Sequence, residues 1–292
     1  MLPTAASIFE KLPRFLRRHR LMIIWMKLTG EPTLQLVRIR NRSFGYADMS
    51  DGFLRLIVID QGFESGFFAL ADRLFAQGGT FLDVGANHGL LSFGLAGRHG
   101  SCVDFHLFEP NLKLLDSIEK TRPLYPQMRL TLNAQAVSDT DGTVSFEINE
   151  NQTGTSHIGN DEAATQVPCV TLDTYVKLHE LTRIDLLKLD IEGYELLALR
   201  GARDSLEARV IRAVYFEYFE KWLQRVAPPA HLLTFLDDAG YAVCFCHSRD
   251  INPRGGATHE FQGISVLPVD VHNMPPMTDL LAVPKEALKL AR

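Results

Sequence analysis

The stretch that decides the fold runs from residue 81 to residue 89 and reads Phe81-Leu82-Asp83-Val84-Gly85-Ala86-Asn87-His88-Gly89. An apolar strand with an acidic residue near its end enters a Gly-x-x-x-Gly turn, and a helix follows. Glycine lets the backbone turn sharply and lets a ligand approach without a side chain in the way. The turn lacks the middle glycine of the Gly-x-Gly-x-x-Gly motif, which brings a pyrophosphate onto a helix N-terminus. Asp83 would repel a pyrophosphate, whereas it suits the cationic ammonium group of an amino-acid-like ligand.

Strand-like and helix-like segments alternate on the C-terminal side of this stretch. Seven short apolar segments have the character of buried strands: 80–84, 103–108, 130–137, 184–189, 210–216, 241–246 and 280–283. Helical spacing of apolar residues marks 67–76, 90–97, 112–121, 194–199 and 230–239. This rhythm predicts an α/β fold with a doubly wound, mainly parallel seven-stranded sheet. Ligands bind beyond the carboxyl ends of the strands in such sheets, so function is expected in the turns that follow them.

Composition argues against nucleic acid as a partner. The 292 residues carry a formal net charge of -5, and the calculated isoelectric point is near 6.1. A protein with an extended basic surface that binds a phosphate backbone has an excess of lysine and arginine over acidic residues. The cysteines, Cys102, Cys169, Cys244 and Cys246, lack the two-residue gap of a zinc knuckle or redox pair. We therefore expect reduced thiols in a cytoplasmic protein.

Two further polar strand ends extend the expected ligand site. Glu109 follows the second strand and lies 20 positions after the last glycine of the turn. Rossmann-like folds place a carboxylate at this offset to bind ribose hydroxyls. Ser138 and Asp139 follow the third strand, where a side chain can reach the exocyclic amine of an adenine. Asp139 fits equally well as the cap of a turn before Asp141-Gly142.

These motifs, taken together, resemble those of the FkbM-type methyltransferases. The resembling segments are Gly62-Phe63-Glu64-Ser65, the turn at 83–89, Phe108-Glu109-Pro110, Val137-Ser138-Asp139, Val170-Thr171-Leu172-Asp173 and Ile184-Asp185-Leu186-Leu187-Lys188-Leu189-Asp190-Ile191-Glu192-Gly193-Tyr194-Glu195. The resemblance extends from about residue 60 to Pro284. The Asp-Val-Gly-Ala-Asn and Lys-x-Asp-x-Glu-Gly motifs are highly specific in this order.

The resemblance implies a methyltransferase that binds S-adenosylmethionine and methylates a hydroxyl of a sugar, glycoconjugate or secondary metabolite. The cofactor-binding residues that it implies are Glu64, Asp83, Gly85, Asn87, Gly89, Glu109, Ser138 and Asp139. The domain would span residues 51–292, with residues 1–50 as a helical and strand-containing N-terminal extension. His88 stands where this family often has an aliphatic residue.

The chemical step requires a positioned oxygen nucleophile and removal of its proton. Lys188, Asp190 and Glu192 are spaced by two, so they share one side of an extended chain. Burying three ionisable groups is costly unless they are paired, so we expect them at the carboxyl edge of the sheet. Asp190 or Glu192 is predicted to act as the base or to bind the substrate hydroxyl. Lys188 would hold their charge or orient a polar substrate.

Other roles remain open for these groups. The trio also fits a structural network that anchors the turn at Gly193. A carboxylate pair could ligate a divalent metal, but no third ligand has a recognisable spacing, so no metal site is predicted. His157, in a loop expected to cover the site, suits proton removal because histidine titrates near neutral pH, although most loop histidines are not catalytic. Glu217 is expected to reach the same edge and Glu220 to be exposed.

The N-terminal segment leaves two readings open. Arg14, Arg17, Arg18 and Arg20 adjoin the apolar stretch 21–26, which is far shorter than the roughly 20 residues that span a bilayer. A basic helix could contact a membrane peripherally or pack on the domain.

Two rival functions of the whole chain also remain: a nicotinamide-dependent oxidoreductase, whose first half would share this architecture, and a non-catalytic cofactor-binding regulator or scaffold. Oligomeric state is not indicated.

Overall fold

The computed structural model describes residues 19–52, 54–55, 63–149, 153–159, 164–246, 259–271 and 273–290. The helices and 3-10 turns are α2 (His19–Thr29), α4 (Ser65–Leu74), α5 (Leu90–His99), α6 (Leu112–Thr121), η2 (Arg122–Leu124), η3 (Thr153–Thr155), α7 (Leu172–Leu178), α8 (Glu195–Arg200), α9 (Arg203–Glu207), α10 (Glu220–Leu223), α11 (Ala230–Asp238) and η4 (Lys285–Ala287). The strands are β1 (Leu34–Arg40), β2 (Ser43–Asp48), β3 (Gly79–Val84), β4 (Val103–Phe108), β5 (Arg129–Asn133), β6 (Ala136–Val137), β7 (Gly142–Glu147), β8 (His157–Ile158), β9 (Thr165–Val170), β10 (Leu186–Leu189), β11 (Val214–Phe219), β12 (Tyr241–Phe245), β13 (His259–Phe261), β14 (Ile264–Pro268), β15 (Met277–Pro284) and β16 (Lys289–Leu290).

The large sheet is wider and more mixed than the sequence predicts. Its ten strands follow the order β16-β13-β14-β12-β15-β11-β10-β3-β4-β5. The run β11-β10-β3-β4-β5 is parallel, as expected, and all pairings beyond β11 are antiparallel. All seven predicted strands lie side by side in this sheet, in the order β12-β15-β11-β10-β3-β4-β5, and four of their six pairings are parallel. The strands β14, β13 and β16 extend the sheet to ten, and β15 runs antiparallel to both of its neighbours. The α/β architecture is confirmed.

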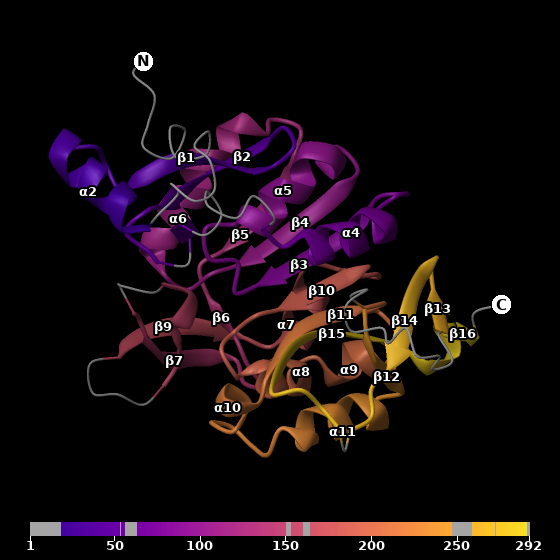
Figure 1. Cartoon of the computed structure of the whole chain (residues 1–292). Coiled ribbons are helices and arrows are strands. Elements are labelled where there is room, and N and C mark those ends of the chain that lie inside the picture. Colours follow the sequence, from indigo (N-terminus) through magenta and orange to yellow (C-terminus); the bar gives the residue numbers. More distant parts are fainter. Residues whose placement is uncertain are drawn as a thin grey trace.

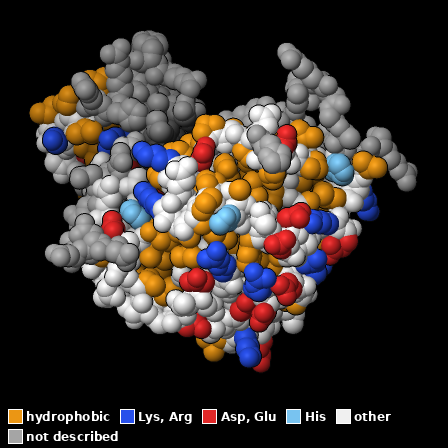
Figure 2. All heavy atoms as spheres, turned by 90° about the horizontal axis from the view of Figure 1, so that it is seen from below, with side chains coloured by type: hydrophobic (Ala, Val, Ile, Leu, Met, Phe, Trp, Pro, Cys, Tyr) orange, Lys and Arg blue, Asp and Glu red, His pale blue; other side chains and the backbone are white. Residues whose placement is uncertain are grey.

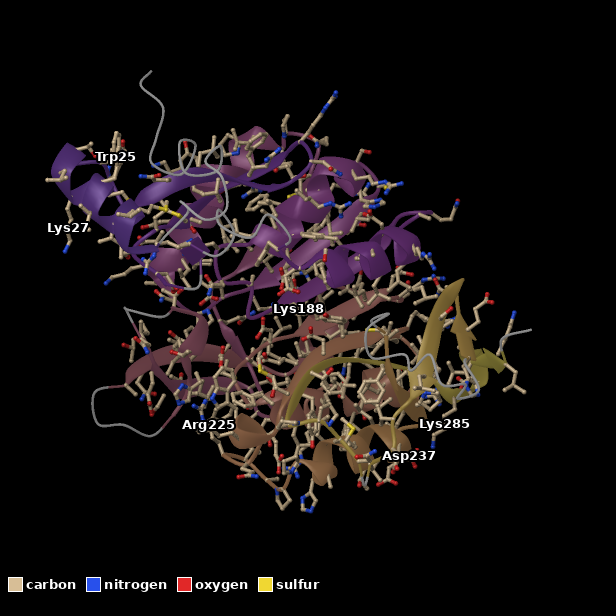
Figure 3. All side chains as sticks on the ribbon, viewed as in Figure 1. Trp25, Lys27, Lys188, Arg225, Asp237 and Lys285 are labelled. Carbon is tan, nitrogen blue, oxygen red and sulfur yellow. The ribbon has the colours of Figure 1, made fainter. Side chains whose placement is uncertain are left out.

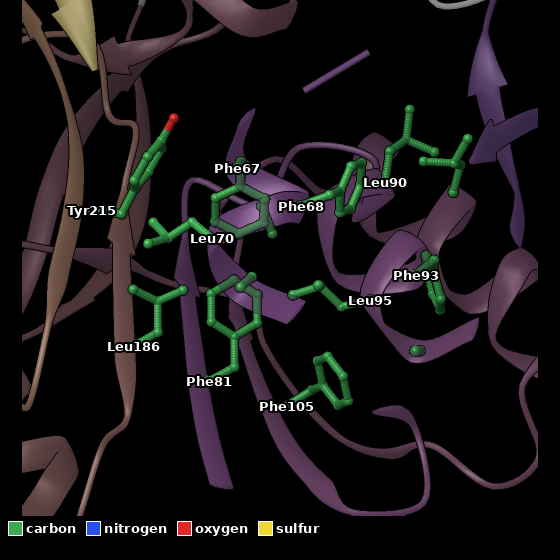
Figure 4. Close-up of a cluster of buried hydrophobic side chains, with 14 of the residues drawn as sticks. Phe67, Phe68, Leu70, Phe81, Leu90, Phe93, Leu95, Phe105, Leu186 and Tyr215 are labelled. Atoms are coloured by element: carbon green, nitrogen blue, oxygen red, sulfur yellow. The ribbon is translucent and has the colours of Figure 1, made fainter. Parts of the chain in front are cut away.

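Apolar residues alternate between two cores, one on each face of the sheet. In β3, Phe81 belongs to the core under α4 and α5, whereas Leu82 belongs to the core under α7, α8 and α11. Successive side chains of a strand point to opposite faces, so a strand that is apolar on both sides needs helices on both. Figure 1 shows these helices above and below the sheet. Phe81 packs edge-on against Phe75, and also against Phe105, which lies beside it in Figure 4.

The predicted strand 130–137 is in fact two strands in different sheets. β5 ends at Asn133, whose side-chain amide donates to the carbonyl of Leu107 and to the hydroxyl of Tyr175. The chain then leaves the large sheet, and β6 pairs with β9 in a four-stranded sheet of order β6-β9-β7-β8. Side chains after β6 consequently belong to this smaller sheet.

The N-terminal hairpin of β1 and β2 packs on the outer side of α5 and α6. The Ser43 hydroxyl donates to the Gly94 carbonyl, and the Tyr46 amide donates to the Thr121 hydroxyl. Val37 and Ile39 join the same core cluster as Phe81. The hairpin is therefore part of the packed body (Figure 1).

Helix α2 buries some of its apolar residues and exposes others. Met22 and Met26 are buried, whereas Ile24, Trp25 and Leu28 are exposed. The basic residues 14, 17 and 18 lie outside the described residues, and no described helix is long and apolar enough to cross a membrane.

Candidate active site

A cavity of about 620 Å³ opens at the carboxyl edge of the parallel strands. This size is typical of a small-molecule site. Eight predicted site residues line it: Glu64, Gly85, Asn87, Glu109, His157, Lys188, Asp190 and Glu192. The loop from Thr153 to Ile158 lies along another wall. The cavity thus lies at the turns after the strands, where the sequence analysis expects a ligand site.

The Gly85 turn is held by its neighbours on both sides. The Gly85 and Ala86 amides both donate to the Phe108 carbonyl, at 3.1 and 3.0 Å. Gly85 has φ +77°, and a Cβ there would lie 2.0 Å from the carbonyl oxygen of Asp190. Only glycine fits this backbone conformation and this close approach. The turn after β3 and the turn after β10 are thus in direct contact.

Glu109 lies buried at the end of β4, with 5% of its surface exposed. Its Oε2 accepts the Asn87 amide and its Oε1 accepts the Asn111 amide, both at 2.9 Å. Burial raises the pKa of Glu109 to about 7, against the lowering effect of these two hydrogen bonds. Each carboxylate oxygen has a second lone pair, so Glu109 can still accept two hydrogen bonds from a ligand.

Lys188 lies at the centre of an ion-pair network. Its Nζ lies 3.2 Å from Asp83 Oδ1 and 3.3 Å from Asp190 Oδ2, and it donates to the Gly85 carbonyl at 3.1 Å. Burial alone would lower the pKa of Lys188, but the two carboxylates outweigh it and raise the pKa. Lys188 therefore remains charged and fixes both turns.

Asp83 and Gly89 support the site from behind the cavity wall. Asp83 is fully buried and is held by Lys188 and by the Ser92 hydroxyl, which donates to it at 2.7 Å. Gly89, at φ +69°, is the N-cap residue of α5, directly before its first residue, Leu90. Neither residue lines the cavity. The Asp83 carboxyl group therefore pairs with Lys188. The sequence analysis instead expected it to pair with the ammonium group of a ligand.

Ser138 and Asp139 also lie outside the cavity lining. They follow β6, in the smaller sheet, and the Ser138 amide donates to the Val170 carbonyl. A Cβ on Gly201 would meet the Ser138 carbonyl at 2.1 Å, so this segment packs against the turn after α8. The sequence placed both residues near an adenine because it treated 130–137 as one strand. Gln135, Ala136 and Val137 line the cavity instead.

The end of the cavity near β10 and β11 is acidic. Burial, with repulsion from Asp190 and Glu217, raises the pKa of Glu192 to about 10. Burial and the carboxylates of Asp190 and Asp279 raise the pKa of Glu217 to about 8. Glu192 is therefore a neutral acid at pH 7. Glu220 is exposed, as the sequence predicted, and Glu217 reaches the edge.

Comparison with known proteins assigns the chain to a family. The methyltransferase FkbM domain matches residues 83–243, more than half of the chain. The chain belongs to the FkbM methyltransferase family. It is 26% identical over 101 residues to the hexuronic acid methyltransferase AglP of Haloferax volcanii, an alignment that covers 35% of this chain and 42% of that protein.

Two solved structures to which the chain is similar are the following. An FkbM methyltransferase from Methylobacillus flagellatus KT is 15% identical, with a TM-score of 0.43, and the match covers 71% of this chain and 44% of that one. TYW2 of M. jannaschii, crystallised with AdoMet, is 9% identical, with a TM-score of 0.40, over 90% of this chain and 89% of that one. The chain thus spans less than half the length of two of the three proteins named.

His157 lines the cavity, and each of its ring nitrogens faces an oxygen of a neighbouring residue. Nδ1 lies 2.9 Å from the Thr155 carbonyl, so it must carry the proton of that hydrogen bond. Nε2 faces Glu147 Oε2 at 3.6 Å, and the ring stacks on Tyr194. His157 therefore forms part of the wall in this arrangement.

His88 presents an unpaired nitrogen to the cavity. Its Nδ1 lies 2.6 Å from the Ser117 hydroxyl, which donates its own proton to the Leu114 carbonyl. Nδ1 must therefore carry the hydrogen, which leaves a lone pair on Nε2. Burial lowers the pKa of His88 to about 4, so the ring is neutral. Nε2 has no hydrogen-bond partner among the described residues.

Sequence reasoning missed several residues that line the cavity or hold its covering loop. Asp51 is buried and accepts both the amide and the hydroxyl of Thr153, at 2.7 and 3.0 Å. Thr153 in turn accepts the Asn87 side-chain amide at 3.3 Å. These contacts hold the covering loop against the Gly85 turn. Asp279 and Trp222 complete the acidic end.

Proposed function

We propose that the protein transfers a methyl group from S-adenosylmethionine to a hydroxyl oxygen of a sugar, glycoconjugate or secondary metabolite. The observation that carries this proposal is Glu109, a buried carboxyl group with free lone pairs beside the Gly85 turn. A carboxylate at this position is suited to binding two vicinal ribose hydroxyls. Family membership supports the reaction class, and the name of the Haloferax relative indicates a sugar acceptor for that protein.

The residues of the cavity fit a cationic nucleoside. Asn87 Oδ1 is a buried acceptor without a hydrogen-bond partner among the described residues, and it can accept an ammonium group. The carboxyl groups that line the cavity are Asp51, Glu64, Glu109, Asp190, Glu192, Glu217 and Asp279, whereas Lys188 is its one lysine or arginine within the described part of the chain. This balance favours a sulfonium and an ammonium group over a pyrophosphate. It therefore disfavours a nicotinamide dinucleotide.

The chain's own groups can position and deprotonate the acceptor. The bound cofactor would supply an electrophilic methyl group. Asp190 lines the cavity, its side chain is 45% exposed, and its carboxyl group is positioned by Lys188 to accept the hydroxyl proton. Glu192 is a neutral acid at pH 7 and can donate a hydrogen bond to a neighbouring acceptor oxygen. Lys188 holds Asp190 in place and balances Asp83.

Transfer of labelled methyl from S-adenosylmethionine into a panel of glycans, glycolipids and metabolites from cell extract tests the reaction. The expected product carries the label in an ether linkage that survives mild alkali. Label in an alkali-labile ester or on nitrogen would contradict the hydroxyl acceptor. Binding of S-adenosylhomocysteine without transfer to any fraction would support a non-catalytic regulator instead.

Binding of S-adenosylhomocysteine is expected to strengthen as pH rises. Burial raises the pKa of Glu109 to about 7, so the carboxylate that accepts the ribose hydroxyls is mostly protonated at pH 6 and mostly ionised at pH 8. Affinity should rise roughly tenfold across this range, in proportion to the ionised fraction. Calorimetry at both pH values measures this change. A flat profile, or an identical slope in Glu109→Gln, would contradict it.

A further inference from the structure

The acidic end of the cavity contains two carboxyl groups on adjacent strands that face each other directly. Glu217 of β11 pairs in register with Asp279 of β15. Side chains of such an antiparallel pair lie on the same face of the sheet, with Cβ atoms about 4.5–5.5 Å apart, and like charges there are destabilising. Asp190 adds a third carboxylate close enough to repel Glu217. The sheet thus concentrates carboxyl groups at one point of the cavity wall.

The described protein groups leave some of these carboxyl oxygens without a hydrogen-bond partner. The Tyr215 hydroxyl hydrogen-bonds Asp279, and Lys188 pairs with Asp190. Glu217 makes no hydrogen bond or ion pair to any other described residue. Glu192 is 7% exposed in the same wall, and its Oε2 has no hydrogen-bond partner within the described residues. A buried carboxyl oxygen without a hydrogen-bond partner destabilises the fold unless a ligand donates a hydrogen bond to it.

The surrounding groups favour a cation as that ligand. Lys188 is already held by Asp83, Asp190 and the Gly85 carbonyl. Arg225 does not line the cavity, and its Nη1 donates to the backbone carbonyl of Glu192 at 2.7 Å. Trp222 and Tyr194 line the same end, and aromatic faces attract cations. An ammonium group can donate three hydrogen bonds, which matches several converging carboxyl oxygens.

We propose that the acceptor carries a protonated amine near the hydroxyl that is methylated, which makes it an amino sugar or a related amino alcohol. The ammonium group binds between Glu217 and Asp279 and reaches Glu192. An acceptor with a carboxylate or phosphate at this point is repelled. This inference rests on the proposed function and adds the substrate class.

Calorimetry on the protein saturated with S-adenosylhomocysteine tests the proposal, because the cofactor's own ammonium site is then occupied. Three probes, D-glucosamine, N-acetyl-D-glucosamine and D-glucose, differ only in the group at C2. A fourth, D-glucuronate, differs from D-glucose only in the carboxylate at C6. We expect glucosamine to bind at least about tenfold more tightly than N-acetylglucosamine and glucose, because one charge-assisted hydrogen bond raises the affinity by about this factor. We expect glucuronate not to bind. Glucosamine should also release a proton at pH 7, since burial raises the pKa of Glu217 to about 8 and the cation lowers it again.

A pair of variants locates the effect. Glu217→Gln should abolish the preference for glucosamine and the proton release, whereas Glu220→Gln, at an exposed position just beyond the same strand, should leave both unchanged. Equal affinity for glucosamine and glucose, binding of glucuronate, or no binding of any probe up to its solubility limit would overturn the proposal. Failure of S-adenosylhomocysteine itself to bind would instead overturn the proposed function.

Discussion

Replacing Lys188 with methionine is expected to lower the free energy of unfolding by about 3–5 kcal/mol, because it leaves a buried carboxylate without its partner. Asp83 is 0% exposed, and Lys188 Nζ lies 3.2 Å from it. Only the Ser92 hydroxyl would then remain as a hydrogen-bond donor to the Asp83 side chain among the described residues. Chemical denaturation measures the loss.

Lys285 provides the matched control. It pairs with Asp237 at 2.7 Å, but these side chains are 47% and 67% exposed. Figure 3 shows Lys188 in the interior and Lys285 at the periphery beside Asp237. Lys285→Met is expected to change the unfolding free energy by less than about 1 kcal/mol. The double variant Asp83→Asn/Lys188→Met should recover part of the loss, and equal losses at Lys188 and Lys285 would contradict the network.

Asp190→Asn is expected to lower kcat for methyl transfer by roughly 10²–10⁴-fold, the usual contribution of a positioned general base. Asparagine keeps the shape of the side chain but cannot accept the hydroxyl proton. S-Adenosylhomocysteine should bind as it does to the wild type, which separates loss of the base from loss of the cofactor site. Initial-rate measurements with labelled methyl donor give both kcat and KM.

Asp116, exposed on α6, serves as the control for this substitution. Asp116→Asn should retain the wild-type kcat. An Asp190→Asn enzyme with unchanged kcat would remove Asp190 from the chemical step and leave Glu217 as the next group to test at this edge of the cavity.

The sequence predicted elements with local signals well. The bounds of β4 and α6 coincide with the predicted 103–108 and 112–121, because their apolar spacing and the Asn111 cap depend on neighbouring residues. Glu109 and the Gly85 turn were also predictable, since both depend on one strand end and its next residues. No broad basic area is visible on the face of the molecule in Figure 2, where acidic and basic side chains are interspersed, in keeping with the net charge.

The remaining features depend on pairings between distant segments. From the sequence alone, Asp83 is interpreted as a residue that contacts the ligand. The register between β3 and β10 places Lys188 beside it, and this register is not encoded locally. Asp279 comes before an apolar strand, and only the antiparallel direction of β15 carries it to the carboxyl edge next to Glu217. Asp51 and Thr153 lie 102 positions apart in the chain. No local pattern of residues contains this information.

The most direct test of the central claim is a calorimetric titration of S-adenosylhomocysteine into the wild type and Glu109→Gln at pH 8. Glutamine has one acceptor oxygen where glutamate has two, so it cannot serve both backbone amides and both ribose hydroxyls. The affinity should fall about 100-fold, as expected for loss of one or two hydrogen bonds to a charged group. Glu119→Gln, on the exposed side of α6, should bind like the wild type. Equal affinity of Glu109→Gln and the wild type, or binding of NAD in place of S-adenosylhomocysteine, would contradict the account.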